Sequence, residues 1–292
     1  MRLWRLALCS ITALAIYVAA SATTTVSAAT RGDDDDDGRY LALGDSVPFG
    51  YIAQAGFEYG NADNFVGYPD YVGHALQLDP AEGSCPGETT ASFLSATAPD
   101  TGCRAYRANA PLHSTYASTQ MRFATAFLRA HRKTRLVTIT LGANDLFLVE
   151  AACSGDLSCV AAQLTAALAN IGANMNTILS RLRATGFDRT IVVANYYSLD
   201  YTDVQRTLIT QALNQTLAAA AAAHHAEVAD TFSAFLAAVS NPFAAGSPCR
   251  AGLVNALSGN QFQCDIHPSQ SGHKLIAAIV DRVARRGRHD SN

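Results

Sequence analysis

Two kinds of hydrophobic pattern alternate along the chain. Short runs of β-branched and aliphatic residues, such as residues 135–141 (Arg-Leu-Val-Thr-Ile-Thr-Leu), are typical of buried strands. Between them, apolar residues recur every three or four positions, as Met121, Ala124 and Leu128 do within residues 118–132, and this period predicts amphipathic helices. The pattern predicts strands at 39–43, 135–141, 190–194 and 227–229, helices at 68–78, 118–132, 157–185, 202–225 and 268–285, and loops at 50–67 and 84–100.

This alternation of strands and helices predicts an α/β fold. It is typical of a parallel sheet that is covered by helices on both faces. Such sheets bind their ligands at the carboxyl ends of the strands. The residues that follow Leu43 and Leu141 are therefore the first candidates for chemistry, and Ser269 is a candidate N-cap of the last helix.

The first 28 residues predict a secretory signal peptide. Arg2 and Arg5 give a short basic start, residues 6–20 are mostly apolar, and residues 27–29 (Ser-Ala-Ala) offer small side chains for cleavage after Ala28. A membrane anchor is the alternative, but the apolar stretch is shorter than the ~20 residues that a span needs. We therefore expect a secreted protein.

Charge and composition divide the rest of the chain. Residues 29–38 include Asp33 to Asp37, a run of carboxylates that predicts a solvated acidic tail. After cleavage, 19 basic side chains face 24 acidic ones, a net charge of −5. We expect residues 39–287 to form a single domain, followed by a short tail at 288–292. No basic run interleaved with aromatic residues is present, which argues against nucleic acid as a partner.

The cysteine count agrees with export. Apart from Cys9, inside the apolar stretch of the signal, six cysteines remain, an even number that indicates disulfides in an exported chain. Six cysteines allow 15 connectivities, and the sequence leaves them open. Pairing neighbours along the chain gives the smallest loops: Cys85 with Cys103, Cys153 with Cys159, and Cys249 with Cys264.

Four short segments carry candidate chemistry. Gly-Asp-Ser at 44–46 follows the first strand, and an Asn at 144 follows the second strong one. Cys-Pro-Gly-Glu-Thr at 85–89 is a turn with an exposed glycine N–H, and Cys-Asp-Ile-His-Pro-Ser at 264–269 precedes the last helix. A serine needs a base to become a nucleophile, and a histidine imidazole suits that task at neutral pH. Preorganised N–H donors then stabilise the negative oxygen of the intermediate.

Together these four segments resemble the SGNH, or GDSL-type, hydrolases, whose blocks occur here in the family's order between Gly44 and His273. The resemblance implies a three-layer α/β/α sandwich with Ser46 as nucleophile and His267 as general base. It also implies an oxyanion hole built from the Ser46 N–H, the Gly87 N–H and the Asn144 side chain. The cysteines and the version of the glycine block are similar to the secreted bacterial lipase and esterase branch.

The sequence departs from the family at the third catalytic residue. Many members have aspartate three residues before the histidine, whereas here position 264 is cysteine and the aspartate is Asp265. Either the Asp265 carboxylate orients the imidazole of His267, or a backbone carbonyl within residues 263–265 does so in a Ser–His dyad. The short spacing slightly favours the dyad.

We therefore expect a serine esterase or lipase that works through an acyl-enzyme, without metal or organic cofactor. Lipid acyl esters rank first as substrates, ahead of carbohydrate acetyl esters, and a phospholipase is a variant of the same chemistry. A secreted binding protein that lost its chemistry is the alternative from another class. We expect a monomer that makes transient contact with lipid aggregates.

The remaining aspartates and histidines near these segments are interpreted as structural. Asp45 and Asp145 hold turns. Surface or core residues rather than metal ligands are expected at His74, His113, the His224-His225 pair and His273.

Overall fold

The computed structural model describes residues 38–257 and 260–289. The expected signal peptide, nearly all of the acidic tail and the last three residues lie outside this range. None of the described helices combines the length and apolarity needed to cross a membrane.

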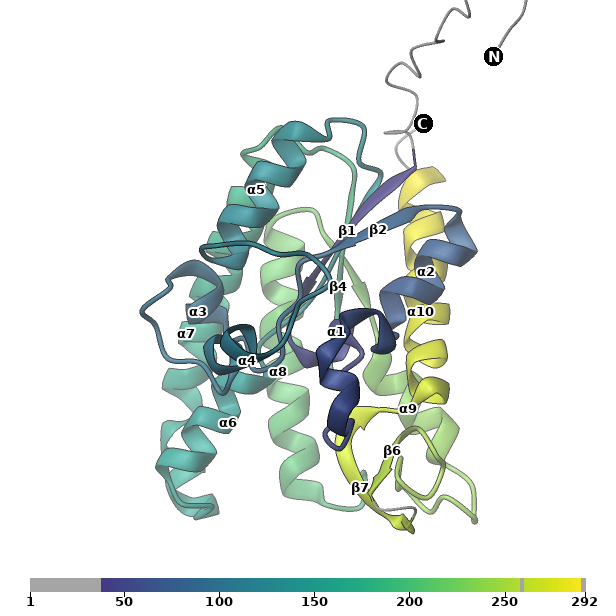
Figure 1. Ribbon diagram of the computed structural model, residues 1–292. Helices are drawn as coiled ribbons and strands as arrows, with labels where there is room; N and C mark the ends of the chain where they lie inside the picture. The colour runs from purple at the N-terminus through teal and green to yellow at the C-terminus, as the bar shows by residue number, and fades with distance from the viewer. Residues whose placement is uncertain (1–37, 258–259, 290–292) are drawn as a thin grey trace, which may run out of the picture. The chain divides into compact units, whose positions relative to one another are not determined.

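A parallel five-stranded sheet lies at the centre of the fold (Figure 1). Its strand order is β2-β1-β3-β4-β5, and each neighbouring pair is parallel. β6 and β7 form a separate antiparallel pair. The strands are β1 (Arg39–Gly44), β2 (Asp79–Glu82), β3 (Leu136–Thr140), β4 (Thr190–Ala194), β5 (Glu227–Ala229), β6 (Val254–Leu257) and β7 (Asn260–Pro268).

Helices cover both faces of this sheet. In Figure 1, α5, α7 and α8 lie on one side of the strands, and α2 and α10 lie on the other. The expected three-layer α/β/α architecture is therefore confirmed. The helices are α1 (Ser46–Phe49), α2 (Tyr68–Leu76), α3 (Thr90–Leu94), α4 (Cys103–Asn109), α5 (Gln120–Ala130), α6 (Ala143–Ala152), α7 (Leu157–Arg183), α8 (Val204–Ala223), α9 (Thr231–Val239) and α10 (Gln270–His289), with short 3₁₀ helices η2 (Gly56–Gly60) and η3 (Ala62–Asn64).

The buried faces follow the hydrophobic pattern. Every residue of β3 is buried, as a central strand with helices on both faces requires. On α10, Ile276, Ala277, Val280 and Ala284 are buried, which places one apolar stripe against β4 and β5. The helix begins one residue after Ser269, whose hydroxyl accepts a hydrogen bond from the Gly272 N–H, so the predicted N-cap is confirmed.

Several elements differ from the predicted pattern: α1, α4, α9, β6 and β7 were not predicted, and the expected loop at 50–67 contains η2 and η3. The expected loop at 84–100 contains α3, because the Thr89 hydroxyl caps its first turn by accepting the Ser92 N–H. β2 was not predicted, since Asp79 and Pro80 are poor strand formers, but it lies at the edge of the sheet where proline is tolerated. α6 was not predicted either, and it starts directly after Gly142.

The end of β1 approaches β3 unusually closely. Gly44 has φ +133°, and a Cβ atom there would lie 2.0 Å from the Thr140 carbonyl oxygen. Only glycine tolerates this combination of backbone angle and contact. The close approach lets the chain turn from β1 directly into α1, so that Ser46 lies at the carboxyl edge of the sheet.

Candidate active site

Ser46 and His267 meet at the carboxyl edge of the sheet, although 221 residues separate them. Ser46 is the first residue of α1, and His267 lies near the end of β7, just before α10. The His267 Nε2 lies 3.0 Å from the Ser46 Oγ, within hydrogen-bonding distance. An imidazole in this position can accept the hydroxyl proton when the oxygen attacks a substrate.

The other ring nitrogen of His267 faces a carboxylate. Its Nδ1 lies 2.7 Å from Asp265 Oδ1, and the second carboxylate oxygen accepts the Ala53 N–H at 3.2 Å. The slight preference for a backbone carbonyl in this place was therefore wrong. The carboxylate folds back past Ile266 because Oδ1 also accepts the Ile266 N–H, and this local hydrogen bond makes the two-residue spacing sufficient.

Two neighbours hold this part of the chain in place. The Tyr197 hydroxyl donates a hydrogen bond to the Ile266 carbonyl at 2.7 Å, and the Tyr51 ring packs edge-on against the imidazole of His267 at 4.8 Å between centroids. Burial raises the pKa of Asp265, but the hydrogen bond and charge of His267, together with the N–H groups of Ala53 and Ile266, outweigh it, so the pKa lies below its usual value. Asp265 is therefore ionised at neutral pH, as a partner for a protonated imidazole must be.

Asn144 lies in the first turn of α6, with its amide orientation fixed by two hydrogen bonds. Its Nδ2 donates to the Glu88 carbonyl at 3.0 Å, and its Oδ1 accepts the Thr101 hydroxyl at 2.7 Å. An amide nitrogen carries two protons, so one N–H remains available to another acceptor. No sequence pattern pointed to Thr101, which lies 43 residues from Asn144.

Gly87 lies in the turn that begins at Cys85. Its φ is +84°, and a Cβ atom would lie 2.7 Å from the Gly102 nitrogen, so this position requires glycine. The disulfide between Cys85 and Cys103 fixes this turn, and Cys103 is the first residue of α4. The other two disulfides join Cys153 to Cys159 and Cys249 to Cys264, which is the neighbour pairing expected from the sequence.

The two aspartates next to these residues hold turns. Asp45 accepts the Val47 N–H at 2.9 Å and the Tyr196 hydroxyl, and burial raises its pKa to about 6. Asp145 accepts both the N–H and the hydroxyl of Thr90, at 2.9 and 2.6 Å, and so ties the start of α6 to the start of α3.

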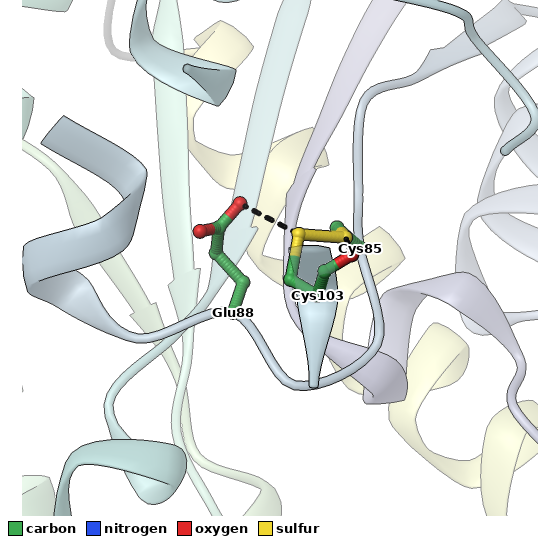
Figure 2. A group of neighbouring side chains, drawn as sticks. All are labelled: Cys85, Glu88 and Cys103. Carbon is green, nitrogen blue, oxygen red and sulfur yellow. Dashed lines mark hydrogen bonds between the residues drawn. A yellow bond between two sulfur atoms is a disulfide. The ribbon is translucent and has the colours of Figure 1, made fainter. Parts of the chain in front are cut away.

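One cluster of potential metal ligands occurs among the described residues, and its chemistry does not suit a metal. It comprises Cys85, Glu88 and Cys103 (Figure 2), but the two sulfurs are bonded to each other. Metal binding requires thiolates, which a disulfide does not supply. His273 is buried, and burial lowers its pKa to about 3, so it is neutral.

An apolar cavity of about 150 Å³ opens beside Ser46 and His267. It lies between α6, the start of α7 and α8, and most of its wall is apolar. Glu150 and Arg206 line it at a solvent-exposed side, where they form an ion pair at 3.1 Å. The apolar wall consists mainly of Leu146, Phe147, Leu157, Val160, Ile209 and Leu213.

A comparison with protein families decides the assignment. The profile of the GDSL-like lipase/acylhydrolase family matches residues 42–275. The chain belongs to this family. It is a carboxylic ester hydrolase, and the matched range contains all four segments that resembled SGNH hydrolases in the sequence.

Solved structures share the fold of this GDSL-like hydrolase at low sequence identity. A phospholipase A1 from Streptomyces albidoflavus is 20% identical, with a TM-score of 0.55, over 85% of this chain and 99% of that one. An extracellular lipase from Streptomyces rimosus is 19% identical, with a TM-score of 0.57, over 84% and 99%. A catalytic mutant of an acetylxylan esterase from Geobacillus stearothermophilus is 17% identical, with a TM-score of 0.50, over 85% and 94%. A search of curated proteins found no match.

Proposed function

We propose that this GDSL-like hydrolase is a secreted serine lipase or esterase with Ser46 as its nucleophile. His267 takes the Ser46 proton as the oxygen attacks the ester carbonyl, and then gives it to the leaving alcohol. Water attacks the resulting acyl-enzyme with the same base in place. The hydrogen bond between Nε2 and Oγ at 3.0 Å supports this assignment.

Asp265 serves as the third catalytic residue in this mechanism. Its carboxylate holds the Nδ1 proton, so that Nε2 is free to accept, and it stabilises the imidazolium that forms. The Ser46 N–H, the Gly87 N–H and the Asn144 amide form the oxyanion hole. The hydrogen bond from the Thr101 hydroxyl supports this role. It fixes Asn144 Oδ1 on Thr101, so that the amide nitrogen points the other way and can donate an N–H to the oxyanion.

From the apolar cavity we infer that the substrate is an ester with an aliphatic acyl chain. An acetyl group would leave most of a 150 Å³ apolar cavity empty, whereas each methylene that enters it is stabilised by about 0.8 kcal/mol. From Asn144 to Glu150 the axis of α6 rises about 9 Å, at 1.5 Å per residue. We infer that the cavity wall along α6 extends about this far from Asn144 to the Glu150–Arg206 ion pair, which suits an acyl chain of medium length.

A panel of p-nitrophenyl esters from acetyl to palmitoyl tests this substrate class. We expect kcat/KM to rise about fourfold per added methylene, the rate equivalent of its burial, until the chain reaches the ion pair. A profile that is highest for acetyl and falls with length would contradict a lipid acyl substrate and favour a carbohydrate acetyl esterase.

A variant within the cavity makes the test specific. Val160 is buried and lines the cavity, so Val160→Phe should remove the gain from long chains and leave acetyl ester hydrolysis within about threefold. Val66→Phe is the matched control, because Val66 is 45% exposed and lies outside the cavity lining. Equal effects of the two variants on the chain-length profile would argue against the cavity as the acyl site.

Three disulfides among the described residues support secretion, because such bonds persist in oxidising compartments. We propose that the first 28 residues direct export and are removed after Ala28. Mass spectrometry of the protein recovered from a culture medium tests this directly. An N-terminus at Ala29 is expected, and an intact Met1 in the cell fraction would overturn the proposal.

A further inference from the structure

Gln120 connects the end of β1 to the glycine turn, and no part of the catalytic scheme above uses it. It is the first residue of α5 and is fully buried. Its Oε1 accepts the Gly44 N–H at 2.6 Å, and its Nε2 donates to the Gly44 carbonyl at 2.9 Å. β2 ends at Glu82, and beyond it the Gly44 carbonyl also accepts the Cys85 N–H at 3.0 Å. Gln120 supplies the acceptor for the Gly44 N–H, in the place that a neighbouring strand would take.

The carboxyl group of Glu88 fixes which way this amide faces. Its Oε2 accepts the Gln120 Nε2 at 3.1 Å, and its Oε1 accepts the Ser92 hydroxyl. The group is 2% exposed and lies against the Cys85–Cys103 disulfide, with Oε2 at 3.6 Å from a sulfur (Figure 2). Burial raises the pKa of Glu88 to about 7. Ser92 and Gln120 lower it, the negative charge of Asp100 raises it, and the positive charge of Arg107 lowers it.

This pair touches the supports of all three proposed oxyanion donors. Gly44 lies two residues before Ser46, and Glu88 directly follows Gly87. The main-chain carbonyl of Glu88 accepts the Asn144 amide at 3.0 Å. The three donors come from separate segments of the chain, and the contacts of Gln120 and Glu88 join those segments behind the site.

We propose that Gln120 is a positioning residue of the oxyanion hole, which acts by holding Gly44, and that Glu88 orients its amide. The inference rests on the proposed function, because it takes Ser46, Gly87 and Asn144 as the donors. Donors stabilise a transition state only when they are held in place before the charge develops, so a loosened support costs turnover more than substrate binding.

The first test replaces the amide by an uncharged side chain of similar shape. We expect Gln120→Met to lower kcat at least tenfold while KM for a butyryl ester changes by less than threefold. Gln215→Met is the matched control, because Gln215 is exposed on α8, and its kcat should stay at the wild-type value. An unchanged kcat in folded Gln120→Met protein would overturn the proposal.

A second variant separates positioning from packing. Protonated glutamic acid can donate to the Gly44 carbonyl and accept its N–H, as glutamine does, whereas a carboxylate can only accept. In Gln120→Glu the new carboxyl group would face Glu88, and repulsion between the two carboxylates would raise the pKa of both, with Asp100, Arg107 and Tyr116 as the other ionisable groups nearby. We expect its kcat relative to wild type to rise at least fivefold from pH 8 to pH 5.5. A constant ratio would contradict the proposal, even if Gln120→Met failed to fold.

Coupling between the two residues gives a third readout. Glu88→Leu removes the acceptor of the Gln120 amide, and we expect a loss in kcat similar to that of Gln120→Met. If the two act as one unit, the double variant should lose no more than about threefold beyond the worse single variant. If the loss in kcat of the double variant equals the product of the two single losses, the residues act separately, and the role given to Glu88 is overturned.

Asn144→Ala, measured in the same series, separates this inference from the proposed function. If Asn144→Ala loses turnover and Gln120→Met does not, the oxyanion assignment stands and the positioning role is wrong. If neither variant loses turnover, the oxyanion assignment within the proposed function fails.

Discussion

Removing the carboxylate of Asp265 should cost about 10³ in kcat. In the proposed mechanism His267 becomes an imidazolium in the transition state. Its Nδ1 lies 2.7 Å from Asp265 Oδ1, which places the charge centres about 4 Å apart. The two side chains are only 11% and 7% exposed. At an effective dielectric constant of about 20, the attraction across ~4 Å is about 4 kcal/mol, or roughly 10³ in rate.

Single-turnover and steady-state rates of Asp265→Ala with a butyryl ester measure this loss. The kcat of Asp265→Asn should lie within tenfold of that of Asp265→Ala, because the amide lacks the negative charge. In addition, three N–H groups point at this side chain, those of His267, Ile266 and Ala53. Its own N–H₂ must then face at least one other donor. Asp281→Ala is the control, since Asp281 pairs with Arg285 on α10 and should leave the rate unchanged.

A loss of less than tenfold in folded Asp265→Ala would contradict a catalytic role for the Asp265 carboxylate. It would mean that water or the backbone orients the ring, and the protein would then work as a Ser–His dyad. The contribution of Asp265 to folding stability should also depend on pH in one direction. Because the folded pKa of Asp265 is lowered, this stability is fully present above the usual value of 3.8 and is lost as the pH falls through the folded pKa.

Three other predictions follow from the contacts of the site. Asn144→Ala should lower kcat by about 10²–10³ through loss of one oxyanion donor. Thr101→Val should lower kcat less, because the Asn144 amide remains but is no longer oriented. Steady-state rates equal to that of the wild type would contradict both roles. Thiol titration of the denatured, unreduced mature protein should find no free thiol, whereas two thiols per chain would remove one disulfide. Because burial raises the folded pKa of Asp45 from 3.8 to about 6, its contribution to stability is complete below pH 3.8 and is lost as the pH rises through 6, by about 3 kcal/mol. Urea unfolding between pH 4 and 8 should therefore show a steeper fall for wild type than for Asp45→Asn, and parallel curves would contradict that sign.

The order of elements could be predicted because each central element is long or strongly apolar. The buried strand β4 was placed at its observed bounds, and β1 and β3 within a residue at each end. Short elements with capping residues inside polar sequence, such as α3, have no such period, and their existence depends on hydrogen bonds such as the one from the Ser92 N–H to Thr89.

The residues at strand ends could be found in the sequence, but their supports could not. Ser46, Asn144 and His267 lie where parallel strands or the last helix begin or end, so their position alone made them candidates. Thr101 and Gln120 act from 43 and 76 residues away along the chain, on Asn144 and Gly44, and nothing in the local sequence distinguishes them. The orientation of Asp265 depended on its bond to Ile266, a detail of side-chain geometry that spacing does not give.

Labelling with a fluorophosphonate tests whether Ser46 is a nucleophile activated by His267. The purified mature protein is treated with the probe, digested and mapped by mass spectrometry, beside the variants Ser46→Ala and His267→Ala. We expect one labelled serine, Ser46, no labelling in Ser46→Ala, and labelling slowed at least 10³-fold in His267→Ala. Labelling at another serine that persists in folded Ser46→Ala, together with ester hydrolysis, would contradict this assignment.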